Sequence, residues 1–406
     1  MPDLGDAPWI VHPSTRAVLD ALEAAGGTDC ARFVGGCVRN TLRGAAVDDI
    51  DIATILEPQA VIAALEAAGL KAVPTGVEHG TVTAISGRRP FEITTLRRDV
   101  ETDGRRAVVA FTTDWAEDAA RRDFTMNALY ADRAGAIFDP VGGGVDDALA
   151  GRVVFVGDPA TRLAEDYLRA LRFFRFQAWY GLGAPDAAGL AACAAVRDRL
   201  TGLAAERISK ELLKLLAAPD PRASAAAMAE TGVLAVLLPE SGPVTTFETM
   251  TTISPDPLLR LAALLPDAPS AGAAATRLRL SNAQRDRLVA ALGPAEALEP
   301  AMSAAALRRL AYRLGPVTTA DRLRLAWARR PEAGEAWARL ASEAERWTPP
   351  VLPVTGEDAM AAGAARGPAV GAALRAVEDW WVARDFADGR EATLAKLAAE
   401  VRELKA

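Results

Sequence analysis

The sequence predicts an α+β fold in which a small mixed sheet occupies the N-terminal part and helices form the rest. Short strand-like segments alternate with a helical segment in the first ~155 residues, and helical patterns dominate afterwards. Half of the 406 residues are apolar and only 6% are aromatic, a composition rich in Ala and Leu that favours helices. A chain of this length exceeds one ordinary core, so several domains are expected.

The expected strands are 31–34, 50–53, 81–85, 91–95 and 137–139. Residues 58–69 have a helical apolar pattern that Gly69 closes. Asp158 and Pro159 form an N-cap and first-turn pair that starts a further helix. Composition changes place candidate boundaries at 151–158, 181–189, 265–276 and 348–355. From these boundaries we expect four parts: a head (1–157), a neck (158–220), a body (221–347) and a tail (348–406).

The segment 33–54 carries the strongest chemical signal. In an extended strand alternate side chains share a face, so Asp49 and Asp51 are expected to project together. Two adjacent carboxylates repel each other unless cations lie between them, and a two-metal pair suits phosphoryl displacement. Upstream, Gly35 and Gly36 allow backbone N–H groups to approach a phosphate closely, and the Arg39 guanidinium can donate hydrogen bonds to a phosphate. The segment therefore predicts a phosphate-and-metal site.

These motifs, in the order GG-x-VR and then D-x-DIAT, resemble the nucleotidyltransferase signature of the DNA polymerase beta superfamily. The resemblance is to the branch of tRNA CCA-adding enzymes and bacterial poly(A) polymerases. It implies a two-metal Mg²⁺ site on Asp49 and Asp51. One position departs from the family pattern, since Asn40 stands where the family usually has Asp, and the amide lacks the charge.

The same resemblance extends along the head. The segment FEITTLRRDV implies that Glu92 is a third carboxylate near the metals. The block RRDFTMNA implies that Arg121 and Arg122 bind the triphosphate, while Asp123 orients them or contacts the ribose. Its phenylalanine, Phe124, is expected in the core. Residues 98–114 resemble the family's mobile loop, with a plain hairpin as the alternative.

The helix expected after Asp158 carries the order EDYLRALR, which resembles the family's nucleobase-reading element. Asp166 can accept from an exocyclic amine, and Arg169 can donate to a ring nitrogen. Cytosine and adenine present that pair of groups, whereas uracil and guanine present a carbonyl and an N–H. The resemblance thus implies that Asp166 and Arg169 select the base and that Glu165 supports Arg169. Downstream, Arg207, Glu211 and Lys214 match a supporting element whose spacing allows ion pairs along one helix.

Charge and composition limit other functions. The net charge is −7, yet residues 308–330 contain seven Arg and one acid, which makes this segment a candidate RNA-facing patch or simply an Arg-rich helical surface. With three Cys and only His12 and His79, a zinc site or a His-rich phosphohydrolase domain is not expected. The chain lacks an apolar run of ~18 residues and a basic-then-apolar N-terminal signal, so a cytoplasmic location without membrane contact is expected.

Together these features predict a metal-dependent tRNA nucleotidyltransferase with a catalytic head, a base-reading neck and a tRNA-binding tail. It would use CTP and ATP to add CMP and AMP to the 3′ end of tRNA. A poly(A) polymerase, an enzyme that adds only CC or only A, and a catalytically silent RNA-binding protein remain as alternatives. The sequence leaves the oligomeric state open.

Overall fold

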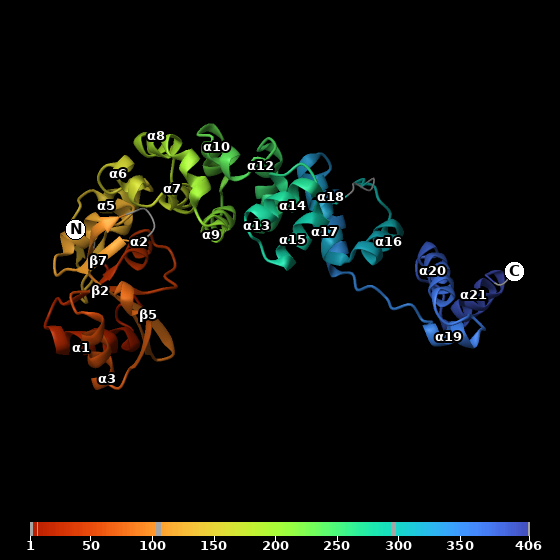
Figure 1. Ribbon diagram of the computed structural model, residues 1–406, viewed down its shortest axis with the longest axis horizontal. Helices are drawn as coiled ribbons and strands as arrows, with labels where there is room; N and C mark the ends of the chain where they lie inside the picture. The colour runs from red at the N-terminus through yellow and green to blue at the C-terminus, as the bar shows by residue number, and fades with distance from the viewer. Residues whose placement is uncertain (1–2, 6, 103–106, 294–297, 405–406) are drawn as a thin grey trace. The chain divides into compact units, whose positions relative to one another are not determined.

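The computed structural model describes residues 3–5, 7–102, 107–293 and 298–404 (Figure 1). The chain divides into two compact units, Met1–Pro239 and Glu240–Ala406. In the described residues, every strand belongs to the first unit, and the second unit is helical. The predicted α+β fold class is confirmed. In the same ranges, no helix combines the length and the hydropathy that a membrane crossing requires.

A seven-stranded mixed sheet forms the centre of the first unit. In spatial order its strands are β3 (Lys71–Gly76), β4 (Thr81–Ser86), β5 (Arg89–Thr95), β2 (Asp51–Thr54), β1 (Ala31–Val34), β8 (Tyr130–Ala131) and β9 (Ile137–Phe138). Only the pair of β2 and β5 is parallel, and the other pairs are antiparallel. A separate two-stranded sheet consists of β6 (Arg97–Thr102) and β7 (Ala107–Phe111).

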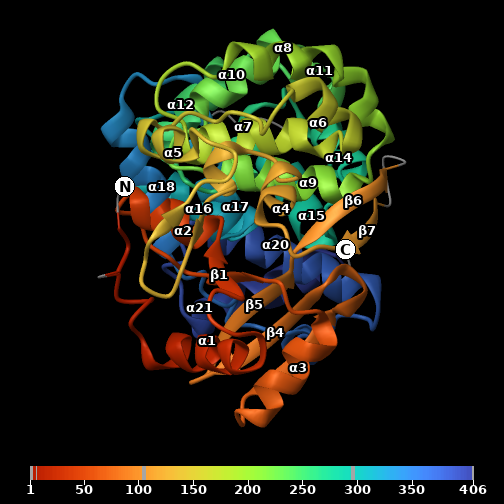
Figure 2. The same ribbon diagram turned by 90° about the vertical axis from the view of Figure 1, so that its left-hand side faces the viewer.

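The two faces of this sheet differ in chemistry. On strand β5, Ile93 pairs with Ile52 of β2 and with Val82 of β4, and all three side chains are fully buried. Helices α1 (Pro13–Gly26) and α3 (Pro58–Ala67) pack against each other and beside β4 (Figure 2). Alternate residues point to the opposite face, which therefore carries the polar side chains of β2, β4 and β5.

Helices complete the first unit and lead out of the head. Their bounds are α2 (Gly36–Leu42), α4 (Trp115–Ala120), α5 (Gly144–Ala150), α6 (Pro159–Glu165), α7 (Leu168–Tyr180), α8 (Ala187–Ala195), α9 (Ala205–Leu216), α10 (Arg222–Glu230) and α11 (Val233–Leu237), with 3₁₀ turns at Val77–His79, Thr125–Asn127 and Arg197–Gly202. Phe124 connects the block after α4 to α7, because its ring lies 5.0 Å from those of Phe155 and Phe176 between centroids. Its expected place in the core is confirmed, since it is fully buried.

Several local expectations need correction. The strand predicted at 50–53 begins one residue later, so Asp49 precedes β2 and does not lie on a strand. The segment 98–114 forms the β6–β7 hairpin in its described part, while residues 103–106 lie outside the described residues. The strands β3 and β8 and the helix α1 were not predicted. The two strands carry weak periodic signals, because β3 lies at the sheet edge and β8 has only two residues.

The helix expected after Asp158 is two helices. Asp158 caps α6 by accepting from the backbone N of Thr161 at 2.8 Å, as expected. The chain then becomes extended at Asp166, where φ is −152°, and the carboxylate accepts from the backbone N of Leu168 at 3.0 Å. This local bond competes with helix continuation, so α7 starts afresh at Leu168.

The second unit comprises ten helices in its described residues. They are α12 (Thr245–Ile253), α13 (Pro257–Ala263), α14 (Ala268–Arg277), α15 (Asn282–Ala291), α16 (Ala304–Leu314), α17 (Pro316–Arg329), α18 (Gly334–Arg346), α19 (Gly356–Ala361), α20 (Pro368–Ala383) and α21 (Arg390–Glu403). One apolar cluster joins α16, α17 and α18, and another joins α19, α20 and α21.

Most arginine side chains of the segment 308–330 have bonding partners within this unit. Four of its arginines have acidic partners, in the ion pairs Arg308–Asp385, Arg313–Asp379, Arg324–Glu345 and Arg330–Glu299. Two others donate to backbone carbonyls, Arg322 to Ala290 and Arg329 to Pro266. These contacts offset much of the positive charge that suggested an RNA-facing patch, which favours the alternative of an Arg-rich helical surface.

Replacement of Phe124 by Ala should destabilise the first unit by about 3–5 kcal/mol, because a fully buried ring leaves a cavity among aromatic neighbours. Urea unfolding followed by circular dichroism measures the loss, and Phe124→Leu should lose less. A loss below about 1 kcal/mol for the Ala variant would contradict this packing role.

Candidate active site

The turn after β1 forms one side of the candidate site. Gly35 has φ 68° and ψ −113°, a conformation that disfavours any residue with a side chain. Its backbone N donates to the carbonyl of Leu129 at 3.0 Å, which fixes the turn against the segment before β8. A Cβ atom on Gly35 would lie 3.7 Å from Nη1 of Arg122. The glycine turn and this guanidinium therefore line the same space.

Two strand carboxylates, Asp51 and Glu92, lie next to each other near that space. The parallel pairing of β2 and β5 places Asp51 directly opposite Glu92, on one face of the sheet. Burial, together with the charges of Glu92 and Asp49, raises the pKa of Asp51 to about 6, although the charge of Arg122 opposes this rise. Asp49, although outside the strand, thus lies within electrostatic reach of Asp51. The site holds more negative than positive charge.

The donor set fits a hard divalent cation. Carboxylate oxygens are Mg²⁺ ligands, and Mg²⁺ usually takes one or two carboxylates and completes its shell with water and substrate phosphates. Among the described residues, no three His, Cys, Asp or Glu side chains converge as a ready-made cage. A cation here would therefore be held by Asp49 and Asp51 together with oxygens from outside the protein.

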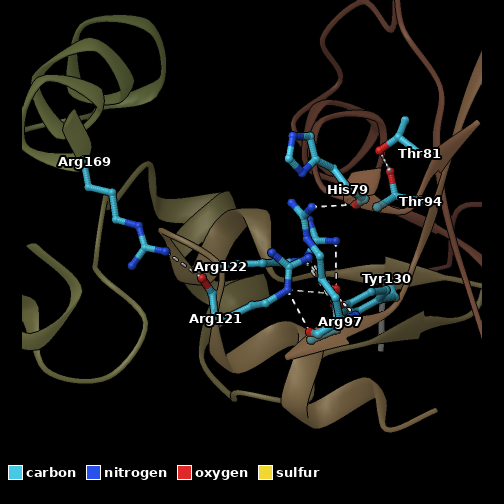
Figure 3. Close-up of polar contacts among 9 residues, drawn as sticks. His79, Thr81, Thr94, Arg97, Arg121, Arg122, Tyr130 and Arg169 are labelled. Carbon is cyan, nitrogen blue, oxygen red and sulfur yellow. Dashed lines mark hydrogen bonds and ion pairs between the residues drawn. The ribbon is translucent and has the colours of Figure 1, made fainter. Parts of the chain in front are cut away.

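Arg121 and Arg122 are held by a residue that sequence analysis missed. The buried carboxylate of Asp118 accepts from Nη2 of Arg121 at 2.7 Å and from Nη2 of Arg122 at 3.0 Å. It also accepts from the hydroxyl of Tyr130 at 2.7 Å and from the backbone N of Arg97 at 3.2 Å (Figure 3). Burial opposes ionisation, yet the charges of Arg122 and Arg121 lower the pKa of Asp118 to about 2. The spacing D-x-x-R-R, which allows i,i+3 and i,i+4 pairs, was the available signal.

Asp123 has a different partner from the one expected. It accepts from Nε of Arg172 on α7 at 2.7 Å and from Nδ2 of Asn127 at 3.0 Å. The expectation that Asp123 orients Arg121 and Arg122 is wrong, because Asp118 occupies that position. Its alternative role, contact with a ribose, stays a prediction.

The structure does not bring Arg39 to the carboxylates. Its buried guanidinium lies 3.8 Å from the ring centroid of Tyr180 and donates to the side chains of Asn127 and Asn40. Asn40 in turn donates through Nδ2 to the carbonyl of Ala46 at 2.9 Å, a bond that an aspartate could not donate. A phosphate contact by Arg39 stays a prediction that would require these contacts to open.

The predicted base-reading residues lie at the junction of α6 and α7. Asp166 and Arg169 have separate partners: Oδ2 of Asp166 accepts from Arg207 on α9 at 2.7 Å, whereas Arg169 pairs with Glu165. Arg169 also donates through Nη2 to the carbonyl of Arg121 at 2.9 Å (Figure 3). The predicted contact between Glu165 and Arg169 is therefore present, and it lies against the Arg121 segment.

Arg207 and Glu211 on α9 form ion pairs with residues outside α9. The expected pairs along one helix are wrong for Arg207 and Glu211, since Glu211 pairs with Arg175 on α7. These contacts tie α9 to α7, so support of the base-reading element stays the favoured interpretation.

Comparisons with known proteins agree with this arrangement. A family model described as the poly A polymerase head domain matches residues 31–154, and one described as a probable RNA and SrmB-binding site of polymerase A matches 186–242. The mitochondrial CCA tRNA nucleotidyltransferase 1 of Mus musculus is 33% identical over 371 residues, which cover 86% of this chain and 82% of the relative. The chain belongs to the CCA tRNA nucleotidyltransferase/poly(A) polymerase family. The predicted family is thereby confirmed.

Two further relatives extend the comparison. The CCA-adding enzyme of Oceanobacillus iheyensis is 43% identical over 185 residues, or 45% of each chain. The crystal structure of the Bacillus stearothermophilus CCA-adding enzyme in complex with CTP superimposes with a TM-score of 0.78 at 27% identity. That match covers 97% of this chain and 99% of the other. The structural similarity therefore extends beyond the head and includes residues of both units.

Asp118→Asn should raise the KM for CTP at least tenfold while leaving the KM for tRNA nearly unchanged, because the amide no longer holds both arginines by charge. Steady-state kinetics with each substrate varied in turn provide the measurement. Tyr130→Phe, which removes a single hydrogen bond to Asp118, should show a smaller rise.

The surface variant Asp20→Asn is a matched control, since Asp20 forms an exposed ion pair with Arg133. Equal effects of Asp118→Asn on both KM values, or none, would contradict a specific role in holding the arginines.

Proposed function

We propose that this protein adds CMP and AMP to the 3′ end of tRNA without a nucleic-acid template and releases pyrophosphate. One observation carries the proposal: the candidate metal site and the candidate base-reading site adjoin each other. The charge of Arg122 acts on Asp51, which pairs with Glu92, and Arg169 is hydrogen-bonded to the adjoining residue Arg121. The CCA-adding relatives named above support the choice of tRNA as acceptor and of CTP and ATP as donors.

Asp49 and Asp51 are the residues that would hold two Mg²⁺ ions, with Glu92 beside them. When bound, such ions lower the pKa of an attacking hydroxyl and screen the triphosphate charge. The raised pKa of Asp51 supports this assignment, because burial and excess carboxylate charge leave the site in need of a cation. In this family divalent metals are the rule, and Mg²⁺ as the particular ion is our proposal.

Protein groups on the other flank would bind the triphosphate. Gly35 and Gly36 let phosphate oxygens approach the backbone, while Arg121 and Arg122 supply charge in fixed orientations set by Asp118. Because Asp118 already restrains both guanidinium groups, little ordering remains to be done when the nucleotide binds.

Base choice would depend on Asp166 and Arg169. Arg207 holds one oxygen of Asp166, and Glu165 holds Arg169, so each side chain has a fixed direction before a base arrives. An acceptor beside a donor matches the amine and ring nitrogen of cytosine and adenine, and it mispairs with uracil and guanine. Such mispairing leaves buried polar groups unsatisfied, which can discriminate by roughly 10⁴.

A poly(A) polymerase remains the second candidate, because the family model over residues 31–154 is described by that name. Transfer reactions on tRNAs that lack CCA, CA or only A, each with one radiolabelled nucleotide, separate the candidates. The proposal predicts C, then C, then A, whereas a poly(A) polymerase would add repeated A to all three. Addition of only CC or only A would narrow the activity, and no addition would leave a silent RNA-binding protein.

We also propose the division into head (1–157), neck (158–220), body (221–347) and tail (348–406), with tRNA contacts in the tail. Two separate apolar clusters, one ending at Ala344 and the next starting at Val354, support a boundary near 348. A cytoplasmic location, from the sequence, completes the proposal.

Asp49→Ala and Asp51→Ala should each abolish nucleotide addition while leaving the fold and tRNA affinity intact, because each removes a proposed metal ligand. Transfer assays in Mg²⁺ measure the loss. The neighbouring exposed residue provides a control, Asp48→Ala, which should keep wild-type activity. Full activity of either test variant would overturn the metal assignment.

Asp166→Ala or Arg169→Ala should lower the preference for CTP over UTP by at least about 100-fold, more than it slows CMP transfer. The reason is that these side chains face the base and do not contact the reacting phosphate. The ratio of kcat/KM for the two nucleotides is the measurement. An equal loss with all four nucleotides would make the pair architectural.

A further inference from the structure

The open part of the sheet beside the carboxylates carries a row of hydroxyl groups. We call the following side chains on β3, β4 and β5 the threonine strip: Thr75, Thr81, Thr83 and Thr94. Thr83 lies opposite Glu92, which in turn lies opposite Asp51, so the strip shares the face of the carboxylates. Every member is at least partly exposed, whereas the alternate residues Val82 and Ile93 are fully buried.

Within the strip, the hydroxyls are joined in pairs. Oγ1 of Thr75 lies 2.9 Å from Oγ1 of Thr83. Oγ1 of Thr81 lies 3.3 Å from Oγ1 of Thr94, and Figure 3 shows this second pair. A hydroxyl has one donor and two acceptor positions. Each pair uses one donor internally and so keeps one O–H donor and several lone pairs for a ligand.

Charges of opposite sign lie at the two ends of the strip. Nη1 of Arg97 donates to the carbonyl of His79 at 2.8 Å, beside the pair of Thr81 and Thr94 (Figure 3). Glu92 and the other carboxylates lie at the opposite end. A neutral hydroxyl surface between a cation and a metal site suits a ribose–phosphate chain, since Ser and Thr hydroxyls commonly bind phosphate and sugar oxygens.

The strand order decides which substrate lies there. Gly35 follows β1, and Arg122 bonds Tyr130 on β8, so the triphosphate side lies beyond β2 in the direction of β1 and β8. The threonine strip lies on the other side of Asp51, on β5, β4 and β3. In an in-line displacement the attacking and leaving oxygens are on opposite sides of phosphorus. The attacking hydroxyl must therefore approach from the threonine strip.

We propose that the threonine strip binds the single-stranded 3′ end of the acceptor RNA through the riboses of its last two nucleotides. This inference rests on the proposed function. Neighbouring strands are about 4.8 Å apart, which places Thr83 about 10 Å from Asp51, beyond the reacting ribose. The 2′-hydroxyl is both a donor and an acceptor, and it is the group by which a protein distinguishes RNA from DNA. The strip thus also selects RNA.

The test uses the full chain with the double substitution Thr83→Val and Thr94→Val, which keeps the β-branched shape that strands favour. The acceptors are tRNA lacking only the terminal CA, whose last two nucleotides are unpaired, and the same tRNA with 2′-deoxyribose in those two nucleotides. The KM for the all-ribose acceptor should rise about fivefold per lost hydrogen bond, with the KM for CTP unchanged. The wild type should prefer the ribose acceptor, and the variant should lose that preference.

A matched control is Thr28→Val, in the exposed turn before β1, at the opposite end of that strand from Gly35. It should behave as the wild type. An unchanged acceptor KM in the double variant, or an equal rise with ribose and deoxyribose acceptors, would overturn the inference while leaving the proposed function in place. A wild type that adds nothing to either acceptor would overturn the proposed function and this inference together.

Discussion

The candidate site depends on the buried carboxylate of Asp118. This one group accepts hydrogen bonds from Arg121, Arg122, the hydroxyl of Tyr130 and the backbone of Arg97. A buried charge is costly unless it is fully paired, and the pairing here fixes two guanidinium groups beside the glycine turn. Helix α4, the β6–β7 hairpin and strand β8 are thus joined at one carboxylate, which restrains the arginines of the proposed phosphate-binding site.

The proposed base-reading helix segment is hydrogen-bonded to the backbone next to the proposed phosphate-binding arginines. Arg169 donates to the carbonyl of Arg121, and Arg162 donates to the carbonyl of Ala120 at 2.8 Å, so both satisfy the C-terminal end of α4. In the proposed mechanism, a base that pairs with Arg169 would therefore act on the segment that carries Arg121 and Arg122. This link gives a physical route by which the correct base could affect the position of the reacting phosphate.

The family could be recognised from local sequence motifs. The motifs around Asp49 and Asp51 and the RRD block are each contiguous in sequence, so the family resemblance could be recognised before any fold was known, and the register of β2 with β5 then placed Glu92 opposite Asp51. Features that depend on tertiary contacts could not be predicted from the sequence. The apolar spacing continues through Asp166, so periodicity did not reveal the break that its capping bond causes. Likewise, nothing local showed that Arg39 turns toward Tyr180, 141 positions along the chain.

We propose that protein side chains alone, without a nucleic-acid template, specify the CCA end. The most direct measurement is the mass of a tRNA lacking CCA after incubation with the protein, Mg²⁺ and all four nucleoside triphosphates. The account predicts one product, heavier by two CMP and one AMP residues, with no further growth. A ladder of added AMP, or incorporation of UMP or GMP at these positions, would contradict it.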